Sequence, residues 1–483
     1  MSQVCYNKNN LRKGDHEMKT LKIIALLLVS FIVLTSCASA SEEIVPVYDP
    51  SVDPDDIDLM GYEYIIAAIA HGDGQGAYAL NPESGYNVRG DRLLQRYKET
   101  EEKYNVTITR IDGIDFGRFL AFYSSGLKYA DLMFACTNHI FCSGYIQSGY
   151  MHAFSDMDLD LHCGIYGPES ALEAGKLGDD YYSVMAYYWG FPAADVVPAM
   201  WFNPRTLGFF QQPNPHELAE QGDWNWSQFE EMCEAMRDTS DPDESKHTFA
   251  AGYSNEPYFE LGALYSNNVH LANINEEGRL VYALNSPEAL EAMDFVRSLA
   301  ERDLIVDLGD RFNITPFVEN RSAFFMEYAH MGLSSEGNDN LAYRVDDSFE
   351  WIYFPTGPKG SSSGPKSVFG FWTRFFYAPA NSDMEAHETL LPYLFQPLPG
   401  ETTENWQDDF ERNNFFSKES FNYFVELRDK AVFDYSVFVD FNTNIAPLLK
   451  QITRGQKSAS ESFVSIEEKV QKYIDKNYND YLE

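Results

Sequence analysis

Three short apolar runs, separated by polar segments of helical character, restrict the fold of this chain more than any other feature. The runs are Tyr62–Ala70, 105–111 and Ala130–Ala135, and the segment 92–104 predicts a polar helix between the first two. Buried strands that alternate with helices are typical of a parallel α/β sheet. Ligands of such sheets bind beyond the carboxyl ends of the strands. The first run leads into a glycine-rich loop, 71–85, which we therefore expect at the ligand edge.

Length and charge limit the number of domains and the kinds of partner. The chain has 483 residues, of which 44% are hydrophobic, and a single core stops growing at about 250–300 residues, so we expect two domains. The net charge of −38 disfavours nucleic acid and anionic lipid headgroups as partners. Aromatic residues make up 15% of the chain, and exposed aromatic faces can stack on ligands with apolar faces.

The amino-terminal stretch 19–43, KTLKIIALLLVSFIVLTSCASASEE, has the pattern of a targeting segment. Its apolar run, 23–34, is about a dozen residues long, whereas a helix that crosses a bilayer needs about 20. Lysines precede the run and small residues follow it, which is the order of a secretory signal peptide. We therefore predict a signal peptide region over residues 1–36, with the true start at Met18.

The end of that segment, Leu34-Thr35-Ser36-Cys37, resembles the lipobox of bacterial lipoproteins. The resemblance implies that Cys37 is lipid-modified and becomes the new amino terminus, which would hold the protein at the outer face of the cell membrane. Residues 37–57 are acidic and rich in proline, and we expect them to form a linker behind the lipidated cysteine. A simple secretory signal with a chance cysteine is the alternative.

The remaining cysteines, Cys136, Cys142, Cys163 and Cys233, lack the paired short spacing of a zinc site. We expect no metal site and no cofactor. A disulfide between Cys136 and Cys142 is possible, but a chain of this length does not need one, and buried free thiols are favoured. HExxH, a phosphate-binding glycine loop with lysine and a dinucleotide fingerprint are all missing from the sequence. The protein is therefore expected not to be an enzyme.

Three later segments carry helix signals. Asn225 and Gln228 form a capping pair before a helix that buries Phe229, Met232, Cys233 and Met236. Ser286 and Pro287 open a second helix with Leu290, Met293, Val296 and Leu299 on one face. The carboxyl-terminal helix has Phe463, Ile466, Val470 and Tyr473 on one stripe.

Five stretches, taken in order, resemble the family 1 extracellular solute-binding proteins of ABC importers, which include the maltose-binding proteins. The resemblance covers nearly the whole chain after the signal. The stretches are 130–154, 200–207 with 225–236, the NEPYF segment at 255–268, 286–305 with 317–332, and 443–475.

The resemblance implies an α/β, two-lobed, type 2 periplasmic-binding-protein-like fold, in which each lobe is a mostly parallel sheet flanked by helices and joined to the other by a hinge. By analogy, lobe 1 would be 58–166 plus 310–368, and lobe 2 would be 167–309 plus 369–483. The implied function is capture of an extracellular solute, most plausibly a carbohydrate, and its delivery to the permease subunits by a monomeric binding protein. A surface receptor of the same fold that feeds a sensor kinase is one alternative. A secreted glycoside hydrolase is a weaker one, because no pair of carboxylates stands out.

The same resemblance suggests where the solute binds. Glu256 and Tyr258 match the family's Glu-Pro-Tyr segment, and Asn138 and His139 occupy the loop where relatives place polar sugar contacts. Tyr328 and His330 lie near the place where relatives have a stacking aromatic residue. Three candidates are balanced by an ordinary structural role: a solvated turn for Asp73, a satisfied structural histidine for His330, and core packing for Trp372. Specificity depends on a few such side chains, so the identity of the solute stays open.

Overall fold

The computed structural model describes most of the chain from Ile57 onward. The described residues are 57–69, 80–85, 87–189, 196–197, 199–254, 256–309, 313–327, 341, 345, 348–360, 367–369, 373–433 and 435–482. By internal contacts the chain divides into Met1–Ser51 and Val52–Glu483, and everything described belongs to the second unit. The predicted signal peptide, Cys37 and nearly all of the acidic linker lie outside the described residues.

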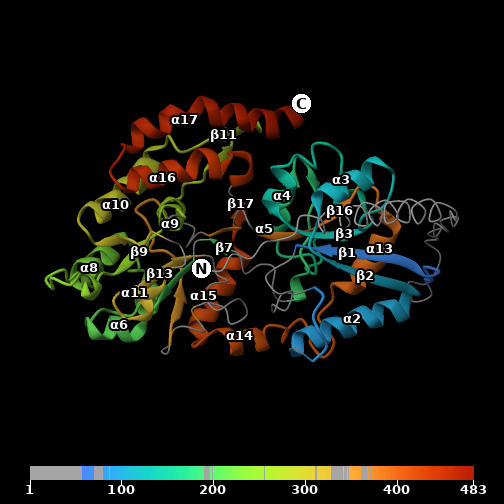
Figure 1. The fold of residues 1–483 in the computed structure, drawn as a ribbon, viewed down its shortest axis with the longest axis horizontal. Helices are drawn as coiled ribbons and strands as arrows, with labels where there is room; N and C mark the ends of the chain where they lie inside the picture. Colours follow the sequence, from blue (N-terminus) through green and yellow to red (C-terminus); the bar gives the residue numbers. More distant parts are fainter. Residues whose placement is uncertain are drawn as a thin grey trace, which may run out of the picture. The chain divides into compact units, whose positions relative to one another are not determined.

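The first sheet confirms the parallel arrangement predicted from the apolar runs (Figure 1). β1 pairs in parallel with β2 along its whole length and with β3 on its other side. β16, which comes from much later in the chain, pairs antiparallel with β3 and with β4. The strands, in sheet order, are β2 (Val106–Asp112), β1 (Tyr62–Ala68), β3 (Leu132–Cys136), β16 (Arg374–Pro379) and β4 (Met151–His152).

The second sheet repeats this arrangement. β12 (Ile305–Asp307) pairs in parallel with β9 (Ala251–Tyr253). A parallel bridge from Phe249 to Ser322 connects β9 to β13 (Phe324–Glu327). β8 (Ala199–Phe202) then pairs antiparallel with β13 and with β14 (Glu350–Ile352). Each sheet therefore has three parallel strands followed by one antiparallel strand that enters from elsewhere in the chain.

Three very short strands connect the two sheets. β7 (Val196–Val197) precedes β8, β15 (Val368–Phe369) precedes β16, and β17 (Val432–Phe433) follows a helix that packs on β14. They pair with one another in the order β17-β15-β7, antiparallel between β15 and β7 and parallel between β15 and β17. Figure 1 shows β7 and β17 between the elements of the two sheets. The antiparallel pair is what two crossings in opposite directions require.

These crossings differ from the lobe boundaries expected by analogy. β13 and β14 lie within 310–368, which was assigned to lobe 1, but they pair with β8 in the second sheet. β16 lies within 369–483, which was assigned to lobe 2, but it pairs with β3 in the first sheet. The chain returns to the first sheet at β15 and not near residue 310, so β13 and β14 stay with the second sheet and β16 belongs to the first. In contrast, α15 (Lys418–Asp429), which packs on β14, lies with the second sheet as expected.

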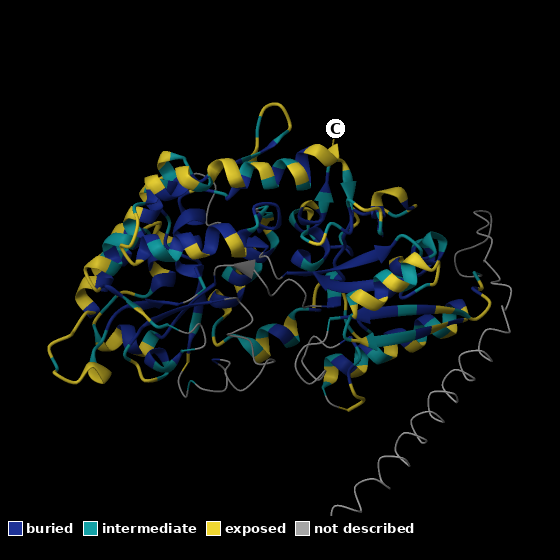
Figure 2. Cartoon of the chain, turned by 45° about the horizontal axis from the view of Figure 1, so that its top comes forward, coloured by how far each residue is buried: buried dark blue, intermediate teal, exposed yellow. Residues whose placement is uncertain are grey.

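Helices cover both faces of the first sheet. α2 (Val88–Tyr104) and α13 (Met384–Leu394) pack with Ile66 and Leu132 on one face, whereas α3 (Phe116–Ser124) and α4 (Thr137–Phe141) pack with Ala67 and Met133 on the other. Figure 2 shows buried strands beneath helices whose outer sides are exposed. The smaller elements of this part are η2 (Phe154–Asp156), α5 (Glu169–Ala174), β5 (Lys176–Leu177), β6 (Asp180–Tyr181) and η3 (Tyr187–Trp189).

The helices around the second sheet begin where the sequence predicts. Asn225 accepts a hydrogen bond from Gln228 N, and Ser286 accepts one from Ala289 N. Phe229, Met232, Cys233 and Met236 are all buried. The helices are α6 (Pro204–Phe209), α7 (Pro215–Gln221), α8 (Trp226–Met236), α9 (Tyr258–Ser266), α10 (Pro287–Glu301), α11 (Thr315–Val318), α14 (Asp408–Asn414), α15 (Lys418–Asp429), α16 (Ala446–Thr453), α17 (Ala459–Ile474) and α18 (Asp480–Leu482), with η5 (Glu244–Lys246), η7 (Ser436–Phe438), η8 (Phe441–Ile445), η9 (Asp475–Asn479) and the hairpin β10 (Ala272–Ile274) and β11 (Leu280–Tyr282).

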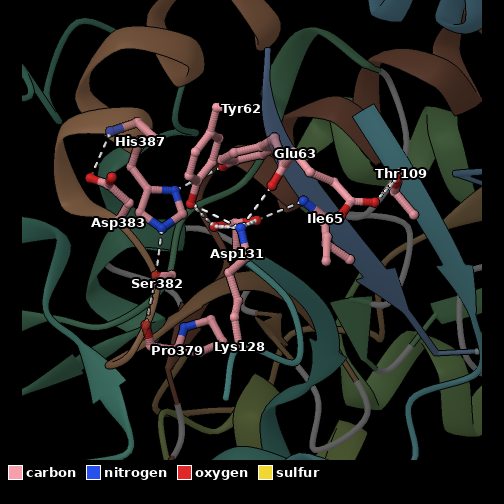
Figure 3. A network of polar contacts seen from close by, with 12 residues as sticks. Tyr62, Glu63, Ile65, Thr109, Lys128, Asp131, Pro379, Ser382, Asp383 and His387 are labelled. Atoms are coloured by element: carbon pink, nitrogen blue, oxygen red, sulfur yellow. Dashed lines mark hydrogen bonds and ion pairs between the residues drawn. The ribbon is translucent and has the colours of Figure 1, made fainter. Parts of the chain in front are cut away.

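Two buried polar networks hold the first sheet to its surroundings (Figure 3). Asp131, which is fully buried, accepts hydrogen bonds from the Tyr62 hydroxyl at 2.5 Å and from Ile65 N at 2.7 Å, and it forms an ion pair with Lys128 at 3.0 Å. Burial raises the pKa of Asp131, while Lys128 and Tyr62 act in the opposite direction. The network ties the start of β1 to the start of β3.

The second network is a chain of neutral hydrogen bonds through His387. The Ser382 hydroxyl donates to Pro379 O at 2.6 Å, so its oxygen must accept from His387 Nε2 at 2.8 Å. His387 Nδ1 is then left to accept from the Tyr64 hydroxyl, also at 2.8 Å. This chain, which connects β1 to α13, requires the neutral imidazole, and burial lowers the pKa of His387 to about 3.

Replacing His387 with glutamine should change how stability depends on pH. The folded-state pKa lies below the unfolded value, so the neutral histidine stabilises the protein above about pH 6.5, and this contribution is lost as the pH falls. We expect the difference in unfolding free energy between parent and His387→Gln to shrink by about 2 kcal/mol between pH 7 and pH 5, measured by urea denaturation. His162→Gln, at an exposed histidine, is the control; an equal change there would contradict the assignment.

Candidate functional site

The carboxyl ends of β1, β2 and β3 lie at one edge of the first sheet, because these strands are parallel. The amino end of β16 lies at the same edge, since β16 runs antiparallel and Arg374 pairs in register with Cys136. Thr137 closes this edge: its backbone N and its hydroxyl both donate to Thr373 O, at 2.8 and 2.7 Å. The start of α4 is therefore held rigidly against β16.

Asn138 is the second residue of α4 and is nearly buried, with 8% of its surface exposed. Within the described part of the chain its side-chain oxygen, Oδ1, accepts no hydrogen bond. A buried amide oxygen without a donor is costly and rare in folded proteins. The hydroxyl group of a ligand at this edge of the sheet would supply the missing donor.

His139 follows Asn138 and stands beside an aromatic ring that the sequence analysis missed. Burial lowers the pKa of His139, so the imidazole is neutral at pH 7. Its ring centroid lies 5.3 Å from that of Phe116, with 60° between the planes. Phe116 is half-buried and begins α3, directly after the loop that follows β2. Its place after the second predicted strand was the signal that could have identified it.

The other predicted pair, Glu256 and Tyr258, lies at the start of α9 beside the second sheet. Glu256 is partly exposed, and its backbone N–H donates to the Ser254 hydroxyl at 3.2 Å. Tyr258 is 4% exposed and belongs to the apolar core. α9 packs against β7, one of the three connecting strands. Tyr258 is therefore the more buried of the two and Glu256 the more accessible, and a ligand role for either stays a prediction.

Four of the predicted binding residues, Asp73, Tyr328, His330 and Trp372, lie outside the described residues. The structure brings together Asn138 and His139, adds Phe116 and Arg374 to the same sheet edge, and sets Tyr258 at the start of α9 with Glu256 two residues before it. The described candidate residues therefore lie in two places: at the carboxyl edge of the first sheet and at the start of α9.

None of the four cysteines from Cys136 onward, all of which lie in the described part of the chain, forms a disulfide. Cys136 and Cys233 are buried, as predicted, and Cys142 is half-buried with its thiol against Val437 O. Cys163 differs from the prediction because it is exposed. The described residues include no group of three or more His, Cys, Asp or Glu side chains placed to hold a metal ion. Among the described helices, none combines the length and the apolar character needed to cross a membrane.

Glu260 is a buried carboxylate on α9, two residues after Tyr258. It is fully buried; Oε1 accepts from the Thr453 hydroxyl at 2.6 Å, and Oε2 has no hydrogen-bond donor among the described residues. Burial raises the pKa of Glu260 to about 6, against the opposing effects of Thr453, Lys450 and Arg454. Near neutral pH, α9 therefore carries a buried carboxylate whose negative charge is only partly balanced by the Thr453 hydrogen bond and the nearby cations.

Comparison with known proteins identifies the fold. No protein-family model and no curated protein matches the sequence. Among solved structures, the chain is similar to a cyclo/maltodextrin-binding protein in complex with maltotetraose, at 15% identity and a TM-score of 0.60 over 88% of this chain and 99% of that one. It is similar to the GacH receptor of Streptomyces glaucescens, solved unliganded and with acarbose, at 13% identity and a TM-score of 0.53 over 87% and 99%.

A third similar structure is UgpB from Mycobacterium tuberculosis in complex with glycerophosphocholine, at 15% identity and a TM-score of 0.55 over 86% of this chain and 99% of that one. Similarity over nearly the whole length of three such chains agrees with the two sheet systems and their connecting strands. The protein therefore has the α/β, two-lobed, type 2 periplasmic-binding-protein-like fold that the sequence predicted.

Replacing Glu260 with glutamine should remove a stability loss that occurs as the pH rises. The folded-state pKa is raised, so the contribution of Glu260 is fully present below about pH 4.5 and is lost through about pH 6. The unfolding free energy of Glu260→Gln, relative to the parent, should rise by about 2 kcal/mol between pH 4 and pH 8. Urea denaturation at both pH values measures this difference, and a constant difference would show that the carboxylate is not titrating.

Proposed function

We propose that this protein is the substrate-binding lipoprotein of an ABC importer, and that it captures an extracellular carbohydrate between its two lobes and delivers it to a membrane permease. The observation that carries the proposal is the pairing of β7, β15 and β17. Two sheets built from different segments of the chain and connected through short paired strands form a hinge, and hinge closure around a ligand is a common binding device. The solved proteins of this fold named above were crystallised with maltotetraose, acarbose and glycerophosphocholine.

The sheet edge that contains Asn138 supports a neutral, hydroxyl-rich ligand. Asn138 offers an acceptor without a donor, His139 is neutral at pH 7, and Phe116 offers an aromatic ring beside it. A sugar presents hydroxyl donors together with a C–H face that can stack on an aromatic ring. We assign Asn138, His139 and Phe116 to the first wall of the site and Glu256 to the second, with Asp73, Tyr328, His330 and Trp372 as further candidates.

Lipid attachment at Cys37 completes the proposal. A charge of −38 opposes adsorption to anionic headgroups, so a binding protein of this kind needs another means of staying near its transporter. Covalent acyl chains supply it, since each buried methylene contributes about 0.8 kcal/mol to membrane binding. The protein would then act as a monomer at the outer face of the cell membrane.

A thermal-shift screen with a carbohydrate panel that includes maltotetraose tests the ligand class. A sugar present at 100 times its Kd should stabilise the protein by about 2.7 kcal/mol. Phe116→Leu and Asn138→Ala should each reduce this shift while leaving the melting temperature of the unliganded protein nearly unchanged. Phe122→Leu is the matched control, because Phe122 lies on the same helix but packs against Tyr129. Stabilisation by glycerophosphocholine and by no sugar would contradict the carbohydrate assignment.

Replacing Cys37 with serine tests the anchor separately. The parent protein should fractionate with membranes and incorporate a labelled fatty acid, whereas Cys37→Ser should do neither and should lose the signal-processing step that depends on the cysteine. Cys163→Ser, which changes the exposed cysteine of the folded part, is the control. Continued membrane association of Cys37→Ser would refute lipidation at that residue.

A further inference from the structure

Arg428 is a buried arginine close to the connecting strands. It lies in the last turn of α15, and 2% of its surface is exposed. Nε donates to Asp429 Oδ1 at 2.8 Å, while Nη2 donates to the Tyr187 hydroxyl at 3.0 Å and to Gln407 Oε1 at 3.3 Å. The guanidinium also lies over the rings of Tyr187 and Trp406. A buried guanidinium is tolerated when ionic and hydrogen-bonding partners surround it, as they do here.

Tyr187 lies in a segment that packs on the first sheet. It begins η3, and two residues later Trp189 is packed into the core of that sheet against Tyr97, Phe376 and Phe395. The Trp189 indole donates to Leu394 O on α13 at 3.1 Å. The Tyr187 hydroxyl donates to the Asp429 carboxylate, 3.1 Å from each oxygen, and accepts from Arg428. Its position is therefore fixed from the first sheet while its hydroxyl reaches α15.

The other end of α15 belongs to the second sheet. The Ser420 hydroxyl donates to Glu350 Oε2 at 2.6 Å, and Trp351 N donates to Ser420 Oγ at 2.8 Å. The ring of Phe424 lies 5.6 Å from that of Trp351 on β14. α15 is thus attached to the second sheet at its amino end and to Tyr187 of the first sheet at its carboxyl end.

This attachment lies where the chain enters the connecting strands. Asp429 is three residues before Val432, the first residue of β17, and β7 is the first strand after η3. Ser367, immediately before β15, donates from its hydroxyl to Leu427 O at 2.9 Å, and its carbonyl accepts from Val432 N. The segments that precede β7, β15 and β17 are therefore held together at one place.

We infer that Tyr187, Trp406, Arg428 and Asp429 form a hinge clamp that sets the range of orientations open to the two lobes. Arg428 is a positioning residue, because it acts through the strands β7, β15 and β17 and not through a ligand. The consequence for ligand affinity rests on the function proposed above. If loss of the clamp lowers the population of the binding-competent orientation tenfold, the apparent Kd rises about tenfold.

The variant Tyr187→Phe tests the clamp with little change in packing. It keeps the ring beneath the guanidinium but removes the hydroxyl that bridges Arg428 and Asp429. The matched control is Tyr64→Phe, which removes one buried tyrosine hydroxyl bond within the first sheet, to His387. Both variants should lower the melting temperature, and only Tyr187→Phe should broaden the distribution of distances between the lobes.

Spin labels at two sites measure that distribution in the absence of any ligand. Cys163, which is exposed, takes one label on the first lobe, and Glu231→Cys on the exposed side of α8 takes the other. The full chain also carries Cys5→Ser and Cys37→Ser. Cys136 and Cys233 are buried, and burial raises the pKa of Cys142 to about 12, so these thiols react slowly.

Pulsed electron–electron double resonance should give a wider distribution of label-to-label distances for Tyr187→Phe than for the parent and for Tyr64→Phe. The same distribution in all three proteins would overturn the clamp, whatever happens to their melting temperatures. Titration with maltotetraose is read separately: if the parent does not bind it while the unliganded distributions still differ, the clamp stands and the proposed ligand class is what fails.

Discussion

The pairing of β7, β15 and β17 is the constraint on which the rest of the structure depends. Each strand is two residues long, so it contributes few hydrogen bonds, but β7 and β15 each lie between a segment of one sheet and a segment of the other, and β17 pairs with β15. Because β15 runs antiparallel to β7, the chain that leaves the first sheet through β7 returns to it through β15. That return delivers β16 to the edge of β3, just as the outward crossing delivers β8 to the edge of β13.

The candidate site follows from this exchange of strands. β16 starts at the edge where β3 ends, so Thr373 O can accept two hydrogen bonds from Thr137 and hold the start of α4. Asn138 and His139 then have fixed positions next to Phe116. Buried networks around Asp131 and His387 hold the rest of the first sheet. Each network requires its central residue to keep a single protonation state near neutral pH.

Much of the first sheet could be predicted because its signals are local. Tyr62–Ala68, Val106–Asp112 and Leu132–Cys136 are strands with the predicted parallel order, and the caps at Asn225 and Ser286 are present. Asn138 and His139 were predicted as ligand contacts because they follow the third strand, where the resembling family has polar sugar contacts, and that role stays a prediction. Phe116 was missed although it follows the second predicted strand, because the residue type alone does not distinguish a half-buried phenylalanine at the sheet edge from a core residue. Tyr258 is buried, which a matching motif could not reveal.

The amino-acid sequence alone determined the class of fold, since apolar runs of strand length that alternate with helical patterns can be buried efficiently only in layered α/β sheets. It did not determine which sheet receives each late segment. Strand partners such as β3 with β16, or β8 with β13, are separated by more than 100 residues and pair through backbone groups that every residue possesses. For the same reason the contacts of Arg428 with Tyr187, across 241 residues of chain, exist only in the folded protein.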